Sequence, residues 1–205
     1  AQLVLTPASE GTAGAKRRAM AHVAERPGSC WYVDQHGNPD NAAAHARTTA
    51  EELWRDTEGR IDALVAGLGT TGTLCGCASV LKVRRPSFQA IGVEPAEAPM
   101  ISGGRFAPHR MMGTSPGLVP DLLDRSLLDE VITLQTEDAF AGVRELARTE
   151  GLLVGITSGA TCVAAREWAR RPGAGGAVVV AVVADSGQRY LSVEGLFGGG
   201  PTSRP

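Results

Sequence analysis

The stretch IDALVAGLGTTGTLCG, residues 61–76, decides the fold that this sequence predicts. An apolar run typical of a strand ends in glycines and threonines, and a helix pattern of small residues follows. A loop that leaves a strand and enters a helix directs free backbone N–H groups outward, and the helix dipole adds positive potential there. The stretch therefore predicts an anion site at the beginning of a helix.

One ligand that fits this stretch is a dinucleotide. Gly67, Gly69 and Gly72 follow the G-x-G-x-x-G pattern, in which glycines let the backbone approach a pyrophosphate closely. Glu94 ends the next apolar run, about where an acid that binds the ribose is expected. These four residues make an NAD-type binding module one possible interpretation.

Three threonines in the same loop favour a different ligand. Thr70, Thr71 and Thr73 add hydroxyl donors, which suit a terminal phosphate with more acceptor oxygens than a bridging pyrophosphate. A dinucleotide fingerprint also tends to open its domain, whereas ~60 residues of strand and helix patterns precede this one. A glycine turn without any ligand is the third possibility that the loop alone leaves open.

Strand-like runs alternate with helix-like runs along the whole chain. The expected strands are residues 3–6, 30–33, 61–67, 89–94, 130–134 and 177–185. The last of these, AVVVAVVAD, is continuously apolar, which favours a central strand buried on both faces. This order predicts an α/β fold, a three-layer sandwich with a mostly parallel sheet between layers of helices.

Composition narrows the class of protein. The chain has 205 residues and an apolar fraction of 43%, which is enough for a core. A net charge of -2 and the lack of a long apolar run give no reason to expect nucleic acid or a membrane as a partner. The cysteines are expected to be reduced thiols of a cytoplasmic protein. Cys75 and Cys77 lack a second pair or a nearby histidine, so no metal site is expected.

Longer motifs resemble the cysteine synthase and cystathionine β-synthase family, the pyridoxal-phosphate enzymes of fold type II. The motifs are VLTPASEGTAGA, DQHGNPDN, VAGLGTTGTLCG, IGVEPAEAPMISGG, GTSPGLVPDLLD, EGLLVGITSGAT and ADSGQRYLS. The resemblance implies the end of a smaller domain at residues 1–35 and a nearly complete larger, cofactor-binding domain at residues 36–197. Residues 198–205 are expected to form a disordered tail.

The resemblance also implies how the cofactor phosphate is bound. Gly69, Thr70, Thr71, Gly72 and Thr73 match the family loop that cradles this phosphate. The cofactor that the resemblance implies is thus pyridoxal 5'-phosphate, and the anion site predicted from residues 61–76 is its phosphate site.

Three further positions acquire roles through the resemblance. Ser186 matches a serine whose hydroxyl faces the pyridine nitrogen, although a turn residue beside a capping Asp185 is the alternative. Gln35 matches a glutamine near the substrate carboxylate, and the residue after it, often aromatic in the family, is His36 here. Gly113 matches a backbone element at the mouth of the site. The other histidines are expected at the surface: His22, His45 and His109.

Two family motifs are absent from this sequence. The stretch resembling S-x-K-D-R, which carries the cofactor lysine, and the stretch resembling T-S-G-N-T-G, which holds the substrate carboxylate, do not occur. Lysine occurs only at Lys16 and Lys82, and both are expected to be solvated. We therefore assign no catalytic residue, and the chain is expected to be the C-terminal part of an enzyme.

The resemblance implies β-replacement on an activated serine such as O-acetylserine, with sulfide or another nucleophile. The lysine would come from a missing N-terminal portion or a partner chain, in a homodimer or in a complex with an N-terminal fragment. The insert at residues 95–129, rich in glycine and proline, is expected to move when substrate binds. A non-catalytic remnant and an NAD-type module are the alternatives.

Overall fold

The computed structural model describes residues 2–197, so the predicted disordered tail at residues 198–205 lies outside the described residues. Within residues 2–197, four strands form one parallel sheet in the order β3-β2-β1-β4. The strands are β1 (Ile61–Gly67), β2 (Gln89–Pro95), β3 (Glu130–Leu134) and β4 (Val178–Ala181). The expectation of a parallel sheet is confirmed.

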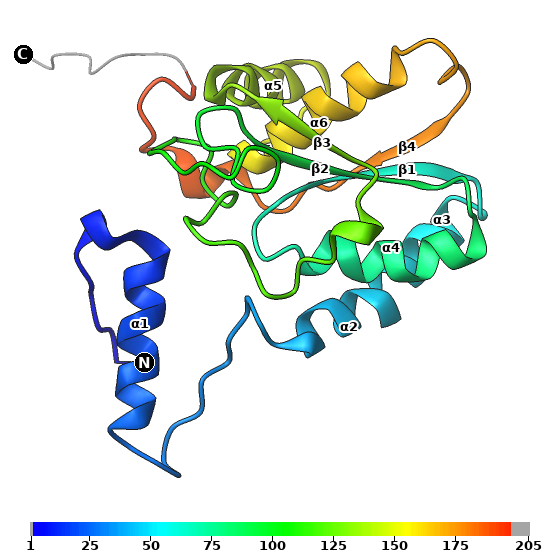
Figure 1. Cartoon of the computed structure of the whole chain (residues 1–205). Coiled ribbons are helices and arrows are strands. Elements are labelled where there is room, and N and C mark those ends of the chain that lie inside the picture. The colour runs from blue at the N-terminus through cyan, green and yellow to red at the C-terminus, as the bar shows by residue number, and fades with distance from the viewer. Residues whose placement is uncertain (1, 198–205) are drawn as a thin grey trace, which may run out of the picture.

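Helices cover both faces of this sheet (Figure 1). One layer contains α2 (Pro39–Arg47), α3 (Thr49–Asp56) and α4 (Gly72–Arg84), and the other contains α5 (Thr136–Thr149) and α6 (Ile156–Ala169). Each layer packs on its own apolar cluster. The predicted three-layer α/β sandwich is therefore the observed fold.

Strand β1 shows why the sheet is buried on both sides. Ala63 and Val65 belong to the cluster beneath α5 and α6, whereas Leu64 and Ala66 belong to the cluster beneath α4. Successive side chains of a strand point to opposite faces, so a strand between two helical layers must be apolar throughout. The run that precedes the glycine loop has this pattern because it lies in the centre of the sheet.

The predicted central strand at residues 177–185 is corrected by the structure. Strand β4 spans only Val178–Ala181, its residues are half-buried, and among the described residues it pairs with β1 alone. A continuous apolar run indicates burial but does not say how many strands flank it. The central position belongs to β1 instead.

The N-terminal segment differs from the prediction as well. Helix α1 (Gly11–Ala24) follows a short 3-10 helix, Ala8–Glu10. Residues 3–6 and 30–33 are not strands in the structure, and Leu3 and Trp31 are exposed. Figure 1 shows this segment beside the sandwich rather than within it. The domain boundary after residue 35 stays a prediction.

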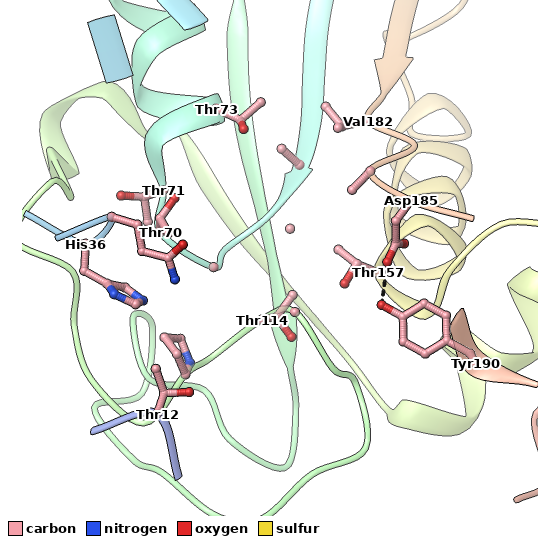
Figure 2. A pocket seen from close by; sticks show the side chains of 17 residues that line it. Thr12, His36, Thr70, Thr71, Thr73, Thr114, Thr157, Val182, Asp185 and Tyr190 are labelled. Carbon is pink, nitrogen blue, oxygen red and sulfur yellow. Dashed lines mark hydrogen bonds between the residues drawn. The ribbon is translucent and has the colours of Figure 1, made fainter. Parts of the chain in front are cut away.

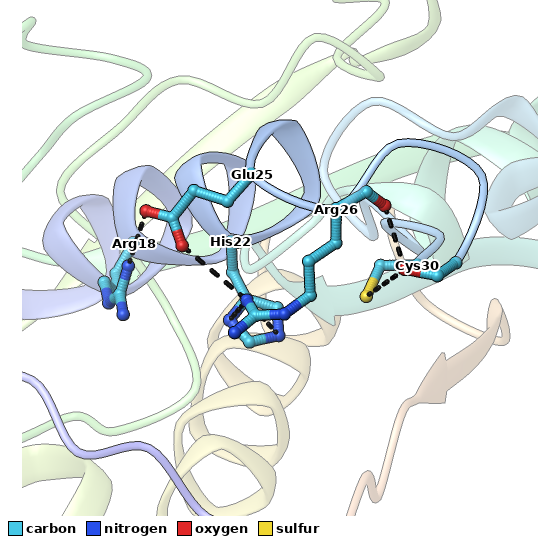
Figure 3. Close-up of polar contacts among 6 residues, drawn as sticks. Arg18, His22, Glu25, Arg26 and Cys30 are labelled. Atoms are coloured by element: carbon cyan, nitrogen blue, oxygen red, sulfur yellow. Dashed lines mark hydrogen bonds and ion pairs between the residues drawn. The ribbon is translucent and has the colours of Figure 1, made fainter.

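Polar contacts of α1 are largely local (Figure 3). Arg18 pairs with Glu25 at 3.6 Å, and His22 Nδ1 lies 2.8 Å from Arg26 Nη1. These bonds hold the helix and the turn after it together but leave His22 outside the sandwich. Within residues 2–197, no helix is long and apolar enough to cross a membrane, and no group of His, Cys, Asp and Glu side chains could bind a metal ion.

Candidate active site

A cavity of about 500 Å³ opens at the carboxyl ends of β1 and β4 (Figure 2). Open parallel sheets of α/β proteins bind ligands at this edge, where the loops after the strands diverge. One wall is the loop of residues 69–73, and the opposite wall contains Thr157, Asp185 and Tyr190. Thr12 and His36 reach the cavity from the N-terminal side.

The predicted phosphate loop has the geometry of an anion cradle. Thr71 precedes α4 in a left-handed conformation, with φ of 66°, and its side chain does not cap the helix. Its hydroxyl oxygen is buried without a hydrogen-bond partner among the described residues. A buried hydroxyl at an uncapped helix N-terminus needs an acceptor, and a phosphate oxygen supplies one.

Two positions of this loop need glycine because neighbouring atoms lie too close for a Cβ atom. A Cβ at Gly69 would lie 2.6 Å from the carbonyl oxygen of Gly113, and one at Gly72 would lie 2.1 Å from Asn41 Oδ1. Asn41 Nδ2 donates to the carbonyl of Gln35 at 2.7 Å and to Thr70 Oγ1 at 3.1 Å. The amide of Asn41 therefore ties the phosphate loop to the turn that carries Gln35.

His45 belongs to the surroundings of this loop, and its expected place at the surface is wrong. Its Nε2 lies 3.0 Å from Thr73 Oγ1, and its Nδ1 lies 2.9 Å from Thr49 Oγ1. Burial lowers the pKa of the imidazole below its usual value of 6.5. No local pattern points to this contact, because His45 and Thr73 are brought together only by the packing of α2 against α4.

The opposite wall carries a hydroxyl and a carboxylate. Thr157 Oγ1 donates to the carbonyl of Met112 at 2.8 Å. Tyr190 donates to Asp185 Oδ2 at 2.5 Å, and burial, together with this carboxylate, raises the pKa of Tyr190 to about 12. The other oxygen of Asp185 is buried and has no partner among the described residues. Figure 2 shows the Tyr190–Asp185 bond at the edge of the cavity.

The structure does not bring Ser186 into this lining. Ser186 is exposed, and its hydroxyl accepts from the N–H of Gln188 at 3.3 Å, at the beginning of the 3-10 helix Gly187–Tyr190. Ser186 therefore has a turn role in the described chain, and its role toward the pyridine nitrogen stays a prediction. Thr157, which sequence reasoning missed, does line the cavity, and the motif EGLLVGITSGAT already contained it.

The other predicted positions do meet at the cavity. Gln35 and Gly113 line it together with Thr70 and the rest of the phosphate loop except Gly72, which lies in the first turn of α4. Gly113 has a φ of 97°, a conformation that favours glycine. The roles of these residues toward cofactor and substrate stay predictions.

The environment of Glu94 disfavours the dinucleotide interpretation. Its side chain is fully buried, and its carboxylate accepts from the N–H groups of Ile101 and Ser102 at 2.9 Å each and from the Ser102 hydroxyl at 2.5 Å. The acid expected to bind a ribose is therefore engaged within the protein. It fastens the beginning of the insert at residues 95–129 to β2.

The fold and the cavity agree with a known family, and the chain belongs to it. The family model described as pyridoxal-phosphate dependent enzyme matches residues 1–185. The cradle fits that cofactor, since an uncapped helix N-terminus, a partnerless Thr71 hydroxyl and close glycine contacts suit a phosphate dianion.

Cysteine synthases are among the relatives of this chain. The chain is 42% identical over 197 residues to a probable cysteine synthase of Bacillus subtilis, covering 95% of this chain and 63% of that protein. It is 38% identical over 194 residues to cysteine synthase 3 of Caenorhabditis elegans, covering 95% and 57%. These matches confirm the resemblance to the cysteine synthase family.

Comparison with solved structures gives the same family. A cysteine synthase from Entamoeba histolytica superposes with a TM-score of 0.91 at 36% identity, over 96% of this chain and 58% of that one. O-ureido-L-serine synthase does so with a TM-score of 0.89 at 38% identity, over 96% and 61%. The chain thus spans about three-fifths of the length of the relatives that it matches.

Proposed function

We propose that this chain is the C-terminal portion of a cysteine synthase-like enzyme that catalyses β-replacement on an activated serine. The substrate would be an O-acetylserine-like amino acid, and the nucleophile would be sulfide or another small group. The observation that carries the proposal is the phosphate cradle at the beginning of α4, in which the Thr71 hydroxyl is buried without a partner among residues 2–197.

The chain's own residues would bind and orient the reactants. The loop of residues 69–73 would hold the phosphate through backbone N–H groups and threonine hydroxyls. Ser186 would present its hydroxyl to the pyridine nitrogen, as the resemblance implies, because this hydroxyl accepts from the N–H of Gln188 and keeps its own proton to donate. Thr157 lines the cavity, but its hydroxyl donates to the carbonyl of Met112. Gln35 would bind the substrate carboxylate from the cavity mouth, as the resemblance implies.

Pyridoxal phosphate, when bound, supplies electron withdrawal from the amino-acid Cα, which allows a β-substituent to leave. A hydroxyl at the pyridine nitrogen keeps this withdrawal weaker than a carboxylate would, which suits β-elimination. The insert at residues 95–129 would exclude water while the substrate reacts. Glu94 anchors one end of it, and Ser115 Oγ donates to the carbonyl of Ala98 at 2.9 Å nearer the cavity.

The lysine for this reaction would come from an N-terminal portion or from a partner chain. We further propose that the assembled enzyme works in the cytoplasm as a homodimer or as a complex with a lysine-bearing chain. The alternatives are a remnant without catalysis, which the same cradle would also serve, and the NAD-type module, which the engaged carboxylate of Glu94 disfavours.

Genetic completion of the chain tests the proposal. The lysine-bearing N-terminal portion of the Bacillus subtilis relative, fused upstream of this chain, should produce cysteine from O-acetylserine and sulfide. The same fusion with that lysine replaced by alanine is the control and should be inactive. A purified fusion that folds and binds pyridoxal phosphate but gives no product would contradict the enzyme and favour the remnant.

A further inference from the structure

We propose that His36 selects the β-substituent of the amino-acid substrate, and that it selects a neutral hydrogen-bonding group such as an ester, an amide or a hydroxyl. The inference rests on the proposed function, because it needs an amino acid bound in the cavity. It names the class of side chain that the cavity accepts.

The backbone around His36 is held on both sides, which fixes where the ring points. The carbonyl of Asp34 accepts from the N–H groups of Gly37 and Asn38 at 3.0 and 2.7 Å, which forms a tight turn. The carbonyl of His36 accepts from the N–H of Leu122 in the insert at 3.1 Å. His36 as a residue is only 4% exposed, and it lines the cavity on the side away from Thr157 (Figure 2).

The ring of His36 keeps its hydrogen-bonding capacity for a ligand. In Figure 2 no bond joins the imidazole to any of the other residues drawn around the cavity. Burial, with Lys16 nearby, lowers the pKa of the ring, while Asp34 and Asp121 oppose this shift. A neutral imidazole offers one N–H donor and one nitrogen acceptor. The ring borders the cavity, so a ligand group that displaces water from it must replace the lost hydrogen bonds, and a polar group does so.

The charged residues around the cavity limit which β-substituents can bind beside His36. Among the described residues that line the cavity, none is lysine or arginine, and the carboxylate of Asp185 is on the opposite wall from His36. Lys16 lies 3.3 Å from Asp34, which commits its ammonium to an ion pair. An anionic substituent beside His36 would therefore lack a cation, and an apolar one would leave the imidazole unpaired. A neutral polar substituent satisfies both conditions.

Stable conjugates of the cofactor with amino acids give a test that needs no lysine. N-(5'-phosphopyridoxyl) derivatives of asparagine, leucine and aspartate have side chains of nearly equal shape, and the alanine derivative reports the cradle alone. Isothermal titration of the full chain should show the asparagine derivative binding about fivefold tighter than the leucine derivative. The aspartate derivative should bind most weakly of the three.

Variants assign this preference to His36. His36→Phe should abolish the preference for asparagine over leucine while the alanine derivative still binds, and His36→Gln, which keeps a hydrogen-bonding group, should retain part of it. His22→Phe is the matched control, because His22 bonds Arg26 outside the cavity, and it should keep the full preference. If His36→Phe fails to fold, the ring nitrogen shifts of His36 in the parent chain decide, since they should move with the asparagine derivative and not with leucine.

The outcomes separate the two proposals. If the alanine derivative does not bind the parent chain, the phosphate cradle is wrong, and the inference about His36 is overturned with it. If the alanine derivative binds, but asparagine and leucine derivatives bind equally or the preference survives in His36→Phe, the role of His36 is overturned and the cofactor site stands.

Discussion

The imidazole of His45 holds the Thr73 side chain of the phosphate loop, with 3.0 Å between Nε2 and Oγ1. The other ring nitrogen lies 2.9 Å from Thr49 Oγ1, so one ring connects α2, α3 and the first turn of α4. The loop that would bind the cofactor is therefore positioned from outside by two helices of its own layer. Loss of the Thr49 hydroxyl would free the His45 ring and thereby loosen its contact with Thr73 in the phosphate loop.

Replacing Thr73 by valine keeps the shape of the side chain and removes its hydroxyl. Binding of pyridoxal phosphate should weaken by about 1–3 kcal/mol, because a phosphate oxygen loses a donor and the His45 ring loses a partner. Isothermal titration of the isolated chain measures this loss. Thr149→Val at the end of α5, where the hydroxyl only donates to the carbonyl of Glu145, is the control and should bind normally. Equal affinities would mean that the phosphate binds elsewhere.

The imidazoles of His36 and His45 should make the stability of the fold depend on pH. Burial lowers the pKa of both His36 and His45 below 6.5, so the unfolded chain binds more protons than the folded chain in this range. The free energy of unfolding should then fall as the pH is lowered through about 6.5. Urea midpoints between about pH 7.5 and about pH 5.5 measure the slope. The double variant His36→Gln, His45→Gln should flatten it, whereas a slope unchanged by the double variant would refute the assignment.

A methyl group at Gly69 should damage the cradle. The added Cβ would lie 2.6 Å from the carbonyl oxygen of Gly113, so either the phosphate loop or the turn that contains Gly113 must shift. Gly69→Ala should lower both the thermal midpoint and the affinity for pyridoxal phosphate, the latter by about tenfold or more. Gly175→Ala is the matched control, since a Cβ there meets nothing within 4 Å. A Gly69→Ala chain with normal affinity would show that this contact yields without cost to the site.

Glu94 should govern the stability of the insert at residues 95–129. Glu94→Gln puts an amide group where the carboxylate now accepts from Ile101 and Ser102, and a donor then faces donors. The free energy of unfolding should fall by about 1–3 kcal/mol, and hydrogen exchange should quicken at residues 99–103. Glu167→Gln on the exposed side of α6 should change neither. Unaltered exchange at residues 99–103 would mean that other contacts fasten the insert.

Local patterns predicted most of the sandwich, because strand alternation and helix periodicity are set by which faces are buried. The run at residues 61–67 and the glycines and threonines after it predicted a strand, a loop and a helix, and these are β1, the loop of residues 69–73 and α4, although the central position had been assigned to residues 177–185. The edge position of β4 was not predictable, because an apolar run indicates burial but not how many strands pair with it. Residues 3–6 and 30–33 have strand composition, but pairing also needs a partner strand, and the described chain gives them none.

The site was predictable where one segment forms it and less so where packing assembles it. Residues 69–73 lie together in the sequence, so their geometry followed from strand, loop and helix. The contact of His45 with Thr73 and the exposure of Ser186 depend on how distant elements meet. Thr157 lay in a recognised motif, but only its place in the cavity distinguishes it from the other hydroxyls of that motif.

The last prediction concerns the two lysines of the chain, neither of which should bond covalently to pyridoxal phosphate. Lys16 lies 3.3 Å from Asp34, and Lys82 lies 2.6 Å from Asp129, so carboxylates hold both ammonium groups. Neither residue lines the cavity of the described chain. An imine needs a free amine at the cofactor aldehyde, and these positions do not offer one.

Borohydride reduction of the chain with pyridoxal phosphate tests this directly, because it fixes the cofactor to any lysine that forms an imine. Peptide mass spectrometry should find no stoichiometric label on Lys16 or Lys82, while the fusion that carries a relative's lysine should be labelled at that residue alone. The variant Lys16→Arg, Lys82→Arg should bind pyridoxal phosphate as the parent chain does, since neither ammonium lines the cavity. Stoichiometric label on either native lysine, together with turnover of O-acetylserine by the chain alone, would show that the chain supplies its own amine and needs no partner.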